Sequence, residues 1–248
     1  MQAYVINLDR SQERMHRMEK LLTHMGVPFI RVPGVDGRAL ASTPIPPSTY
    51  GNFLSHMKCW EMIAEGTEPF GLCLEDDVVF ARNFREVFDD RRLLALDADI
   101  IRLEAFPTTM LLGPRLASLA GGYHARRLHN PSSGMAAYIV SKQGARWLLE
   151  NAKPVDNVDE VVFGSEFCRV RKIVTLLPSP CTQYENAAGM PQDPAVSTST
   201  ITGQRVDRSR PKKTLATRLR NELSVVWNRL RGRVRIDPTL HPSGPLIL

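Results

Sequence analysis

Short apolar runs alternate with amphipathic stretches along most of the chain, up to about residue 183. Residues 3–8 predict a strand, and residues 11–26 predict a helix because methionine and leucine recur at helical spacing before Gly26. The pattern then predicts strands within 27–38, 71–80, 98–104 and 171–183, helices over 51–66 and 80–96, a strand followed by a helix within 134–151, and an acidic loop at the start of 154–163. Strands that alternate with helices favour an α/β fold with a mainly parallel sheet flanked by helices.

The composition divides the chain into a body and an extension. With 248 residues, 43% of them hydrophobic, the chain can bury the core of one ordinary domain. Small and polar residues dominate from about 186 to 211, which predicts a flexible linker. We therefore expect a folded domain over 1–184, a linker over 185–213, and a basic amphipathic helix with a tail over 214–248.

The net charge of +6 is concentrated near the end of the chain. Residues 205–235 hold eleven lysines and arginines against two acidic residues. A helical projection of residues 214–233 gives a narrow apolar stripe flanked by arginines, which is typical of a helix that lies on an anionic membrane surface. Docking of this stripe on the folded domain is the main alternative. Nucleic acid is not expected as a partner, because Trp227 is the only aromatic residue in the stripe.

Other features of the sequence indicate a cytoplasmic protein. The four cysteines have no metal-binding spacing and are typical of reduced thiols. We find no signal peptide and no apolar run long enough to cross a bilayer. The expected location is therefore cytoplasmic, with the basic helix as a peripheral contact to the inner membrane.

Three consecutive carboxylates follow the apolar run at 72–74, namely Glu75, Asp76 and Asp77. Adjacent carboxylates repel one another unless a cation or a proton relieves the repulsion. Because alternate residues of a strand share a face, Glu75 and Asp77 are the pair expected to converge on a divalent metal. The alternative is a solvated acidic loop after a core strand.

Polar residues also occur where the first strand ends. Asn7, Arg10 and Arg14 lie at or beyond its carboxyl end, where guanidinium groups can bind phosphates. Their alternative role is that of exposed residues at a helix start. His56 is interpreted as a helix histidine with a local partner rather than a metal ligand.

Seven segments occur in an order that resembles glycosyltransferase family 25, which includes lipopolysaccharide-type transferases and relatives of the collagen galactosyltransferases. They are YVINLDRSQERMHRM, VPGVDGR, FLSHMKCW, LCLEDDVVF, SSGMAAYIVSKQGARWLL, PVD and LLPSPCTQ, and they cover roughly residues 3–183. One departure lies before the Ser-His pair, where the family has Gly-Glu-x-Gly-Cys and this chain has STYGN at 48–52.

The resemblance implies a GT-A-like fold, a nucleotide-sugar donor such as UDP-galactose, a divalent metal such as manganese, and transfer to a glycan hydroxyl with inversion. It assigns metal binding to Glu75 and Asp77, with Asp77 also catalytic, and donor binding to Asn7, Arg10, Arg14, Asp36, Gly37 and Asp76. Asp156 is the expected general base, while Asp159 and Glu104 stay open as alternatives. The acceptor is expected to be of lipopolysaccharide or lipooligosaccharide type.

Two other classes of protein fit the residues. A metal-dependent phosphohydrolase or nucleotidyltransferase also uses an acidic strand end, although such enzymes usually have more acidic or histidine ligands. A non-catalytic sugar-binding protein with the same fold is the second alternative.

Overall fold

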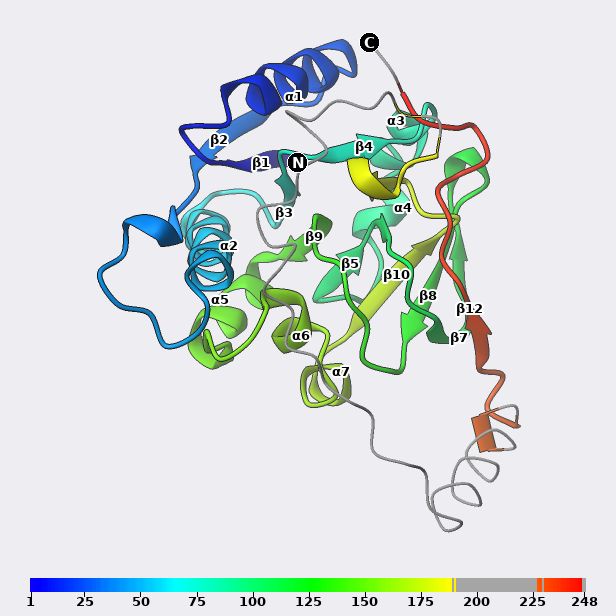
Figure 1. Ribbon diagram of the computed structural model, residues 1–248. Helices are drawn as coiled ribbons and strands as arrows, with labels where there is room; N and C mark the ends of the chain where they lie inside the picture. Colours follow the sequence, from blue (N-terminus) through cyan, green and yellow to red (C-terminus); the bar gives the residue numbers. More distant parts are fainter. Residues whose placement is uncertain (189, 191–226, 229, 247–248) are drawn as a thin grey trace.

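The computed structural model describes residues 1–188, 190, 227–228 and 230–246 (Figure 1). Within these residues a nine-stranded sheet has the order β12-β7-β8-β10-β5-β9-β3-β1-β2. Its strands are β1 (Gln2–Asn7), β2 (Phe29–Pro33), β3 (Phe70–Glu75), β5 (Ile100–Arg102), β7 (Met110–Ser118), β8 (His124–Leu128), β9 (Ala137–Ser141), β10 (Ile173–Leu177) and β12 (Val234–Ile236). A smaller sheet has the order β4-β11-β6, with β4 (Val78–Phe80), β6 (Glu104–Ala105) and β11 (Cys181–Gln183).

Most strands of the large sheet run in one direction. β2, β1 and β3 pair in parallel, as do β5 and β10, while β9 pairs antiparallel with both β3 and β5. Consequently β3 and β5 share a direction although β9 lies between them. The edge formed by β8, β7 and β12 is antiparallel. The α/β architecture predicted from the sequence is confirmed, with β9 as a reversed strand inside it.

Helices cover both faces of the large sheet (Figure 1). On one face lie α1 (Gln12–His24), α3 (Phe84–Phe88) and α4 (Arg91–Leu94), whose apolar residues join one core cluster. On the other face lie α2 (Pro47–Glu65), α5 (Lys142–Asn151), α6 (Val158–Val162) and α7 (Phe167–Val170), which contribute to the second cluster. Short 3-10 turns occur at Gly37–Ala39, Ala120–Gly122 and Tyr184–Asn186.

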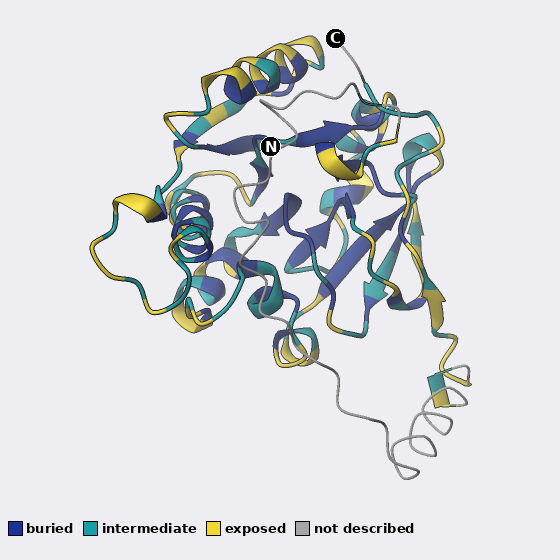
Figure 2. Cartoon of the chain, viewed as in Figure 1, coloured by how far each residue is buried: buried dark blue, intermediate teal, exposed yellow. Residues whose placement is uncertain are grey.

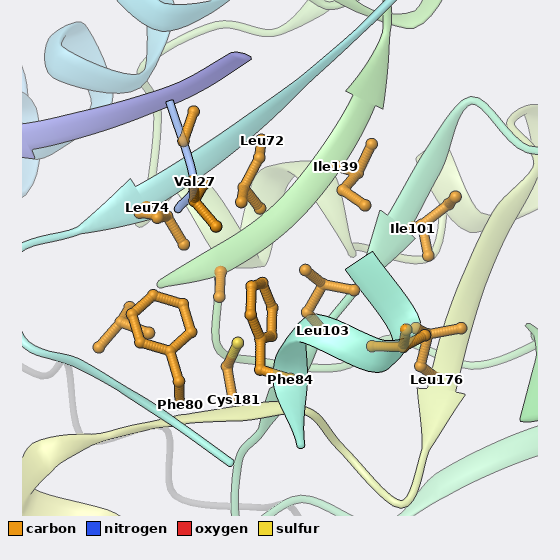
Figure 3. Close-up of a cluster of buried hydrophobic side chains, with 14 of the residues drawn as sticks. Val27, Leu72, Leu74, Phe80, Phe84, Ile101, Leu103, Ile139, Leu176 and Cys181 are labelled. Carbon is orange, nitrogen blue, oxygen red and sulfur yellow. The ribbon is translucent and has the colours of Figure 1, made fainter. Parts of the chain in front are cut away.

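Strand alternation assigns the side chains of each strand to the two cores. Val5 of β1 and Leu74 of β3 belong to the α1 side, whereas Tyr4 and Cys73 belong to the α2 side. Figure 3 shows the α1-side cluster, where residues of the small sheet such as Phe80 lie against β3 and β9. The buried strands at the centre of Figure 2 are therefore apolar on both faces, as their continuous apolar runs predicted.

The structure differs from the sequence prediction in several elements. The helix expected over 80–96 is replaced by β4 and the two short helices α3 and α4, and the predicted loop within 154–163 contains α6. The strand expected over 71–80 ends at Glu75, because the chain turns there and continues as β4 in the smaller sheet. Strands β7 and β8 were not predicted.

The end of the chain returns to the body. β12 pairs antiparallel with β7, and the Leu246 backbone N–H donates to the Phe80 carbonyl at 2.8 Å. Residues 234–246 thus pack on the folded domain, although the sequence placed them in a separate tail. Most of the predicted linker, and most of the predicted helix over 214–233, lie outside the described residues. No helix among the residues described is both long and apolar enough to cross a membrane.

Candidate functional site

Polar side chains gather in a pocket where the neighbouring parallel strands β1 and β3 end. Its lining includes seven of the predicted site residues, Arg10, Arg14, Asp36, Gly37, Glu75, Asp76 and Asp77, together with residues of α2 and Gln183 of β11. Ligands of open α/β sheets bind at the carboxyl ends of such strands. The geometry of the fold therefore brings most of the predicted site residues to one place.

Asp76 is held by residues of β1 and α1. The Asn7 side-chain amide donates to Asp76 Oδ2 at 2.7 Å, and Arg14 Nη1 donates to Asp76 Oδ1 at 2.9 Å. Burial raises the pKa of Asp76, while the charge of Arg14 and the bond from Asn7 oppose that rise. Asn7 is itself buried and does not line the pocket. It therefore acts behind Asp76 and orients this carboxylate.

Asp77 is the least satisfied carboxylate of the three. Its Oδ1 atom is buried and has no hydrogen-bond partner among the described residues, and its Oδ2 atom lies 3.8 Å from Arg14 Nη1. Burial and the nearby charges of Glu75 and Asp76 raise the pKa of Asp77 to about 8. A carboxylate in this situation needs a proton or a cation, and it lines the pocket where a cation can reach it.

Glu75 faces the opposite side of the sheet and contacts α2. Its Oε1 atom lies 3.2 Å from His56 Nε2 and 3.3 Å from the Asn52 amide nitrogen. Burial alone raises the pKa of Glu75, but the bonds from His56 and Asn52 and the charge of Arg14 outweigh it, so the pKa is lowered. Glu75 is thus the carboxylate that the protein holds ionised.

A buried chain of hydrogen bonds orients His56. Its Nδ1 atom lies 3.0 Å from the Tyr138 hydroxyl, which accepts a bond from Trp60 Nε1 at 2.8 Å. Since Trp60 can only donate, the Tyr138 hydroxyl is free to donate to His56 Nδ1, which leaves the Nε2 proton for Glu75. The sequence interpretation of His56 as a residue with a local partner was wrong, because its partners come from β3 and β9.

The loop at 33–38 packs tightly on the start of α2. A Cβ atom on Gly37 would lie 1.6 Å from the Pro47 carbonyl oxygen, so only glycine permits this contact. Asp36 forms an ion pair with Arg10 and accepts a bond from the Arg38 backbone N–H at 3.1 Å. Gly37 therefore has a packing role that its resemblance-based assignment to donor binding did not include.

Arg17 is a residue near the site that the sequence analysis missed. Its Nη2 atom donates to the carbonyls of Asp76 at 3.1 Å and Val78 at 2.8 Å. Burial lowers the pKa of Arg17, while Asp77 and Asp76 oppose that shift. The helical spacing of Arg14 and Arg17 was the available signal, because residues three apart on a helix share a face.

The three candidate bases have different surroundings. Asp156 lies half-buried in the loop before α6 and is not among the residues that line the pocket. Asp159 accepts from the backbone N–H groups of Gly134 and Glu160, at 2.8 and 2.9 Å. Glu104 is fully buried, and burial raises its pKa to about 8 although Arg102 opposes the rise. The structure does not bring these residues into the pocket beside the triplet.

The pocket suits a cation that is shared with a ligand. Among the described residues no three histidine, cysteine or acidic side chains are grouped closely enough to bind a metal by themselves. Glu75 and Asp77 nevertheless line one pocket, and the unpartnered Asp77 oxygen gives a free ligand atom. Carboxylate oxygens suit hard divalent cations, which often complete their coordination with substrate phosphate. The residues thus fit such an ion together with a phosphate ligand.

Replacement of Tyr138 by phenylalanine tests the buried hydrogen-bond chain. Tyr138→Phe leaves Trp60 Nε1 and His56 Nδ1 without their partner, so the free energy of unfolding is expected to fall by about 1–3 kcal/mol. Chemical denaturation measures the change. Tyr50→Phe is the control, since the only printed environment of Tyr50 is a half-buried position on α2. Equal stability of Tyr138→Phe and the unmodified protein would contradict the role of the chain.

The raised pKa of Asp77 predicts how stability depends on pH in the presence of a chelator. The folded state holds a proton on Asp77 that the unfolded state releases near the ordinary value of 3.8. Stability from this proton is complete below that value and is lost as the pH rises toward about 8. Asp77→Asn should flatten this decline, and Glu104→Gln should do so separately.

Urea denaturation at several pH values measures this slope. Asp97→Asn is the control, because Asp97 is an exposed residue paired with Lys172. Retention of the full slope in Asp77→Asn would show that Asp77 carries no proton in the folded protein.

Curated proteins with similar sequences are glycosyltransferases by name. A "Putative glycosyltransferase" of Haemophilus influenzae is 24% identical over 249 residues, which cover 93% of this chain and 86% of that protein. A "Glycosyltransferase 25 family member" of Aedes aegypti is 29% identical over 62–64% of this chain's length class, covering 64% of it and 30% of that protein. "Procollagen galactosyltransferase 1-B" of Xenopus laevis is 28% identical, covering 62% of this chain and 28% of that protein. The chain therefore spans less than a third of the two animal relatives.

Solved structures give a weaker likeness. A glycosyltransferase "involved in the glycosylation of the major capsid of PBCV-1" has a TM-score of 0.42 and 9% identity, and the match covers 77% of this chain and 95% of that one. The inositol-1-phosphate CTP transferase from T. maritima also has a TM-score of 0.42, with 10% identity over 83% of this chain and 98% of that one.

The family model described as "Glycosyltransferase family 25 (LPS biosynthesis protein)" matches residues 1–162. This match includes β1, α1, α2 and the acidic triplet, so it covers the pocket and most of the folded body. The resemblance inferred from the sequence is confirmed, and the chain belongs to glycosyltransferase family 25.

Proposed function

We propose that the chain transfers a sugar from a nucleotide-sugar donor to a hydroxyl of a glycan, with a divalent metal bound at the acidic triplet. The observation that carries this proposal is the buried Asp77 oxygen without a partner, in a pocket that Glu75, Arg10 and Arg14 also line. Family membership supplies the reaction class. A donor diphosphate together with its metal suits a pocket that contains both carboxylates and guanidinium groups.

The chain's own residues divide the work at the donor. Glu75, held ionised by His56 and Asn52, and Asp77 would hold the metal, for which manganese is our proposal. When bound, such an ion neutralises the charge that develops on the leaving diphosphate. Arg10 is partly exposed beside Asp36 and can contact a phosphate, whereas Arg14 is engaged with Asp76 and positions it.

Asp156 remains our proposal for the general base. Of the three candidates, Glu104 is fully buried and both oxygens of Asp159 accept backbone N–H groups. Asp156 is half-buried, on a loop that leads into α6, and α6 packs against α2, which also lines the pocket. A base must reach the acceptor hydroxyl, so partial exposure favours Asp156. Transfer with inversion follows if this carboxylate acts on the face opposite the diphosphate.

The names of relatives guide the choice of substrates. Procollagen galactosyltransferases are among the similar proteins, which supports UDP-galactose as the donor. The family description names lipopolysaccharide biosynthesis, which supports a lipopolysaccharide or lipooligosaccharide acceptor. A panel of nucleotide sugars, assayed with and without manganese and acceptor, separates the proposal from its rivals. A transferase turns over faster with acceptor, a hydrolase does not need one, and a binding protein shows no turnover.

The metal proposal predicts a specific defect in Asp77→Asn. Loss of one charge at the metal should nearly abolish manganese-dependent transfer and weaken the thermal shift that donor plus manganese produces. The fold should persist, since the amide keeps the shape of the carboxyl. Asp89→Asn is the matched control, because Asp89 forms only an exposed ion pair with Arg85. Full activity of Asp77→Asn in chelator would rule out the assignment.

The proposed base predicts a different defect in Asp156→Asn. Turnover should fall by roughly a hundredfold or more, while the donor-induced thermal shift should stay almost unchanged. Asp159→Asn is the comparison, because its oxygens serve the backbone and its loss should affect stability more than turnover. If turnover is normal in Asp156→Asn, the role passes to Asp159 or Glu104.

A further inference from the structure

The sheet edge made by β7, β8 and β12 carries a group of arginines without acidic partners. Elsewhere arginines such as Arg85, Arg92 and Arg171 form ion pairs. Within the described part of the chain, no such pair is formed by Arg115 of β7, Arg126 of β8, or Arg231, Arg233 and Arg235 at β12. Positive charge at this edge is therefore not neutralised by the described residues.

The arrangement of these arginines has a cost in the free protein. Arg115 lies directly opposite Arg126 in the β7–β8 register, and like charges in opposite positions destabilise a sheet. The half-buried His129 responds to the same field. Burial and the charges of Arg233, Arg127 and Arg231 lower the pKa of His129 to about 4. An anionic partner at this edge would relieve the repulsion.

Exposed apolar side chains lie at the same edge. Seven large hydrophobic residues are exposed within the described ranges, and four of them belong here: Leu116 (49%), Trp227 (56%), Leu230 (77%) and Val234 (41%). The chain before β12 follows β7, since a Cβ on Gly232 would lie 3.3 Å from Pro114 Cγ. The Arg231 guanidinium lies 4.5 Å from the centre of the Trp227 ring. Figure 2 shows β12 as exposed at the border of the molecule.

We propose that this edge, defined by Arg115, Leu116, Trp227, Leu230, Arg231 and Arg233, binds the surface of an anionic lipid membrane. Guanidinium groups bind headgroup phosphates, and tryptophan and leucine side chains enter the boundary between headgroups and acyl chains. Nucleic acid would not reward exposure of Leu116, Leu230 and Val234, and Trp227 is the only exposed ring in the group. The proposal goes beyond sugar transfer and does not depend on it.

Vesicle sedimentation of the whole chain tests this surface. We expect binding to phosphatidylcholine vesicles that contain phosphatidylglycerol and none to phosphatidylcholine alone. Arg231→Gln combined with Arg233→Gln should weaken binding by roughly thirtyfold. Lys20→Gln combined with Arg91→Gln removes the same charge from exposed positions on α1 and α4, and should weaken it much less. Equal loss in both variants would overturn the proposal, since net charge alone would then explain binding.

Tryptophan fluorescence adds a readout that does not depend on charge. Trp60 is fully buried, whereas Trp227 is exposed, so a blue shift on anionic vesicles reports insertion of Trp227. Trp227→Phe should abolish the shift and retain sedimentation. Circular dichroism of each variant confirms folding. Absence of vesicle binding at low salt, an unchanged blue shift in Trp227→Phe, or tighter binding to a single-stranded oligonucleotide than to vesicles would each overturn the proposal.

Discussion

The repulsion among three carboxylates at the end of β3 is the constraint on which the site depends. Strand alternation sends Glu75 to the α2 side and Asp76 to the α1 side, so each acquires its own donors. His56 and Asn52 stabilise the charge of Glu75, and Asn7 and Arg14 do the same for Asp76. Asp77 follows the strand in a turn and keeps a buried oxygen without a partner. The protein thus satisfies two carboxylates and leaves the third for a ligand.

This division explains why the helices near the site lie where they do. α1 follows β1 directly and places Arg14 against Asp76, while Arg17 holds the backbone of the turn after β3. α2 must approach closely enough for His56 to reach Glu75, and the glycine at 37 permits that approach because any side chain there would collide with the start of the helix. Packing and electrostatics therefore demand the same positions, which is the consistency expected of a sequence that specifies one structure.

Local patterns predicted much of the site because its central part is local. β1, α1 and β3 follow from apolar periodicity, and the rule for strand ends then brings Arg14 and the triplet together. Other features depend on pairs far apart in the chain. Tyr138 and His56 are 82 residues apart, so no local pattern connects them. The direction of β9 likewise depends on its connection, since an apolar run is the same read either way. β7 escaped prediction because Gly113 and Pro114 interrupt its pattern.

The sheet order relates the pocket to the basic edge. β3, which carries the triplet, is separated from β7 by β9, β5, β10 and β8, and five strand spacings amount to about 24 Å. A membrane bound along β7 and β12 would therefore leave the pocket outside the headgroup layer and open to a soluble nucleotide sugar. The acceptor hydroxyl of a glycolipid must then lie several sugars away from its lipid anchor to reach the pocket. Attachment at this edge would favour extension of an oligosaccharide over modification of the first sugar next to the lipid.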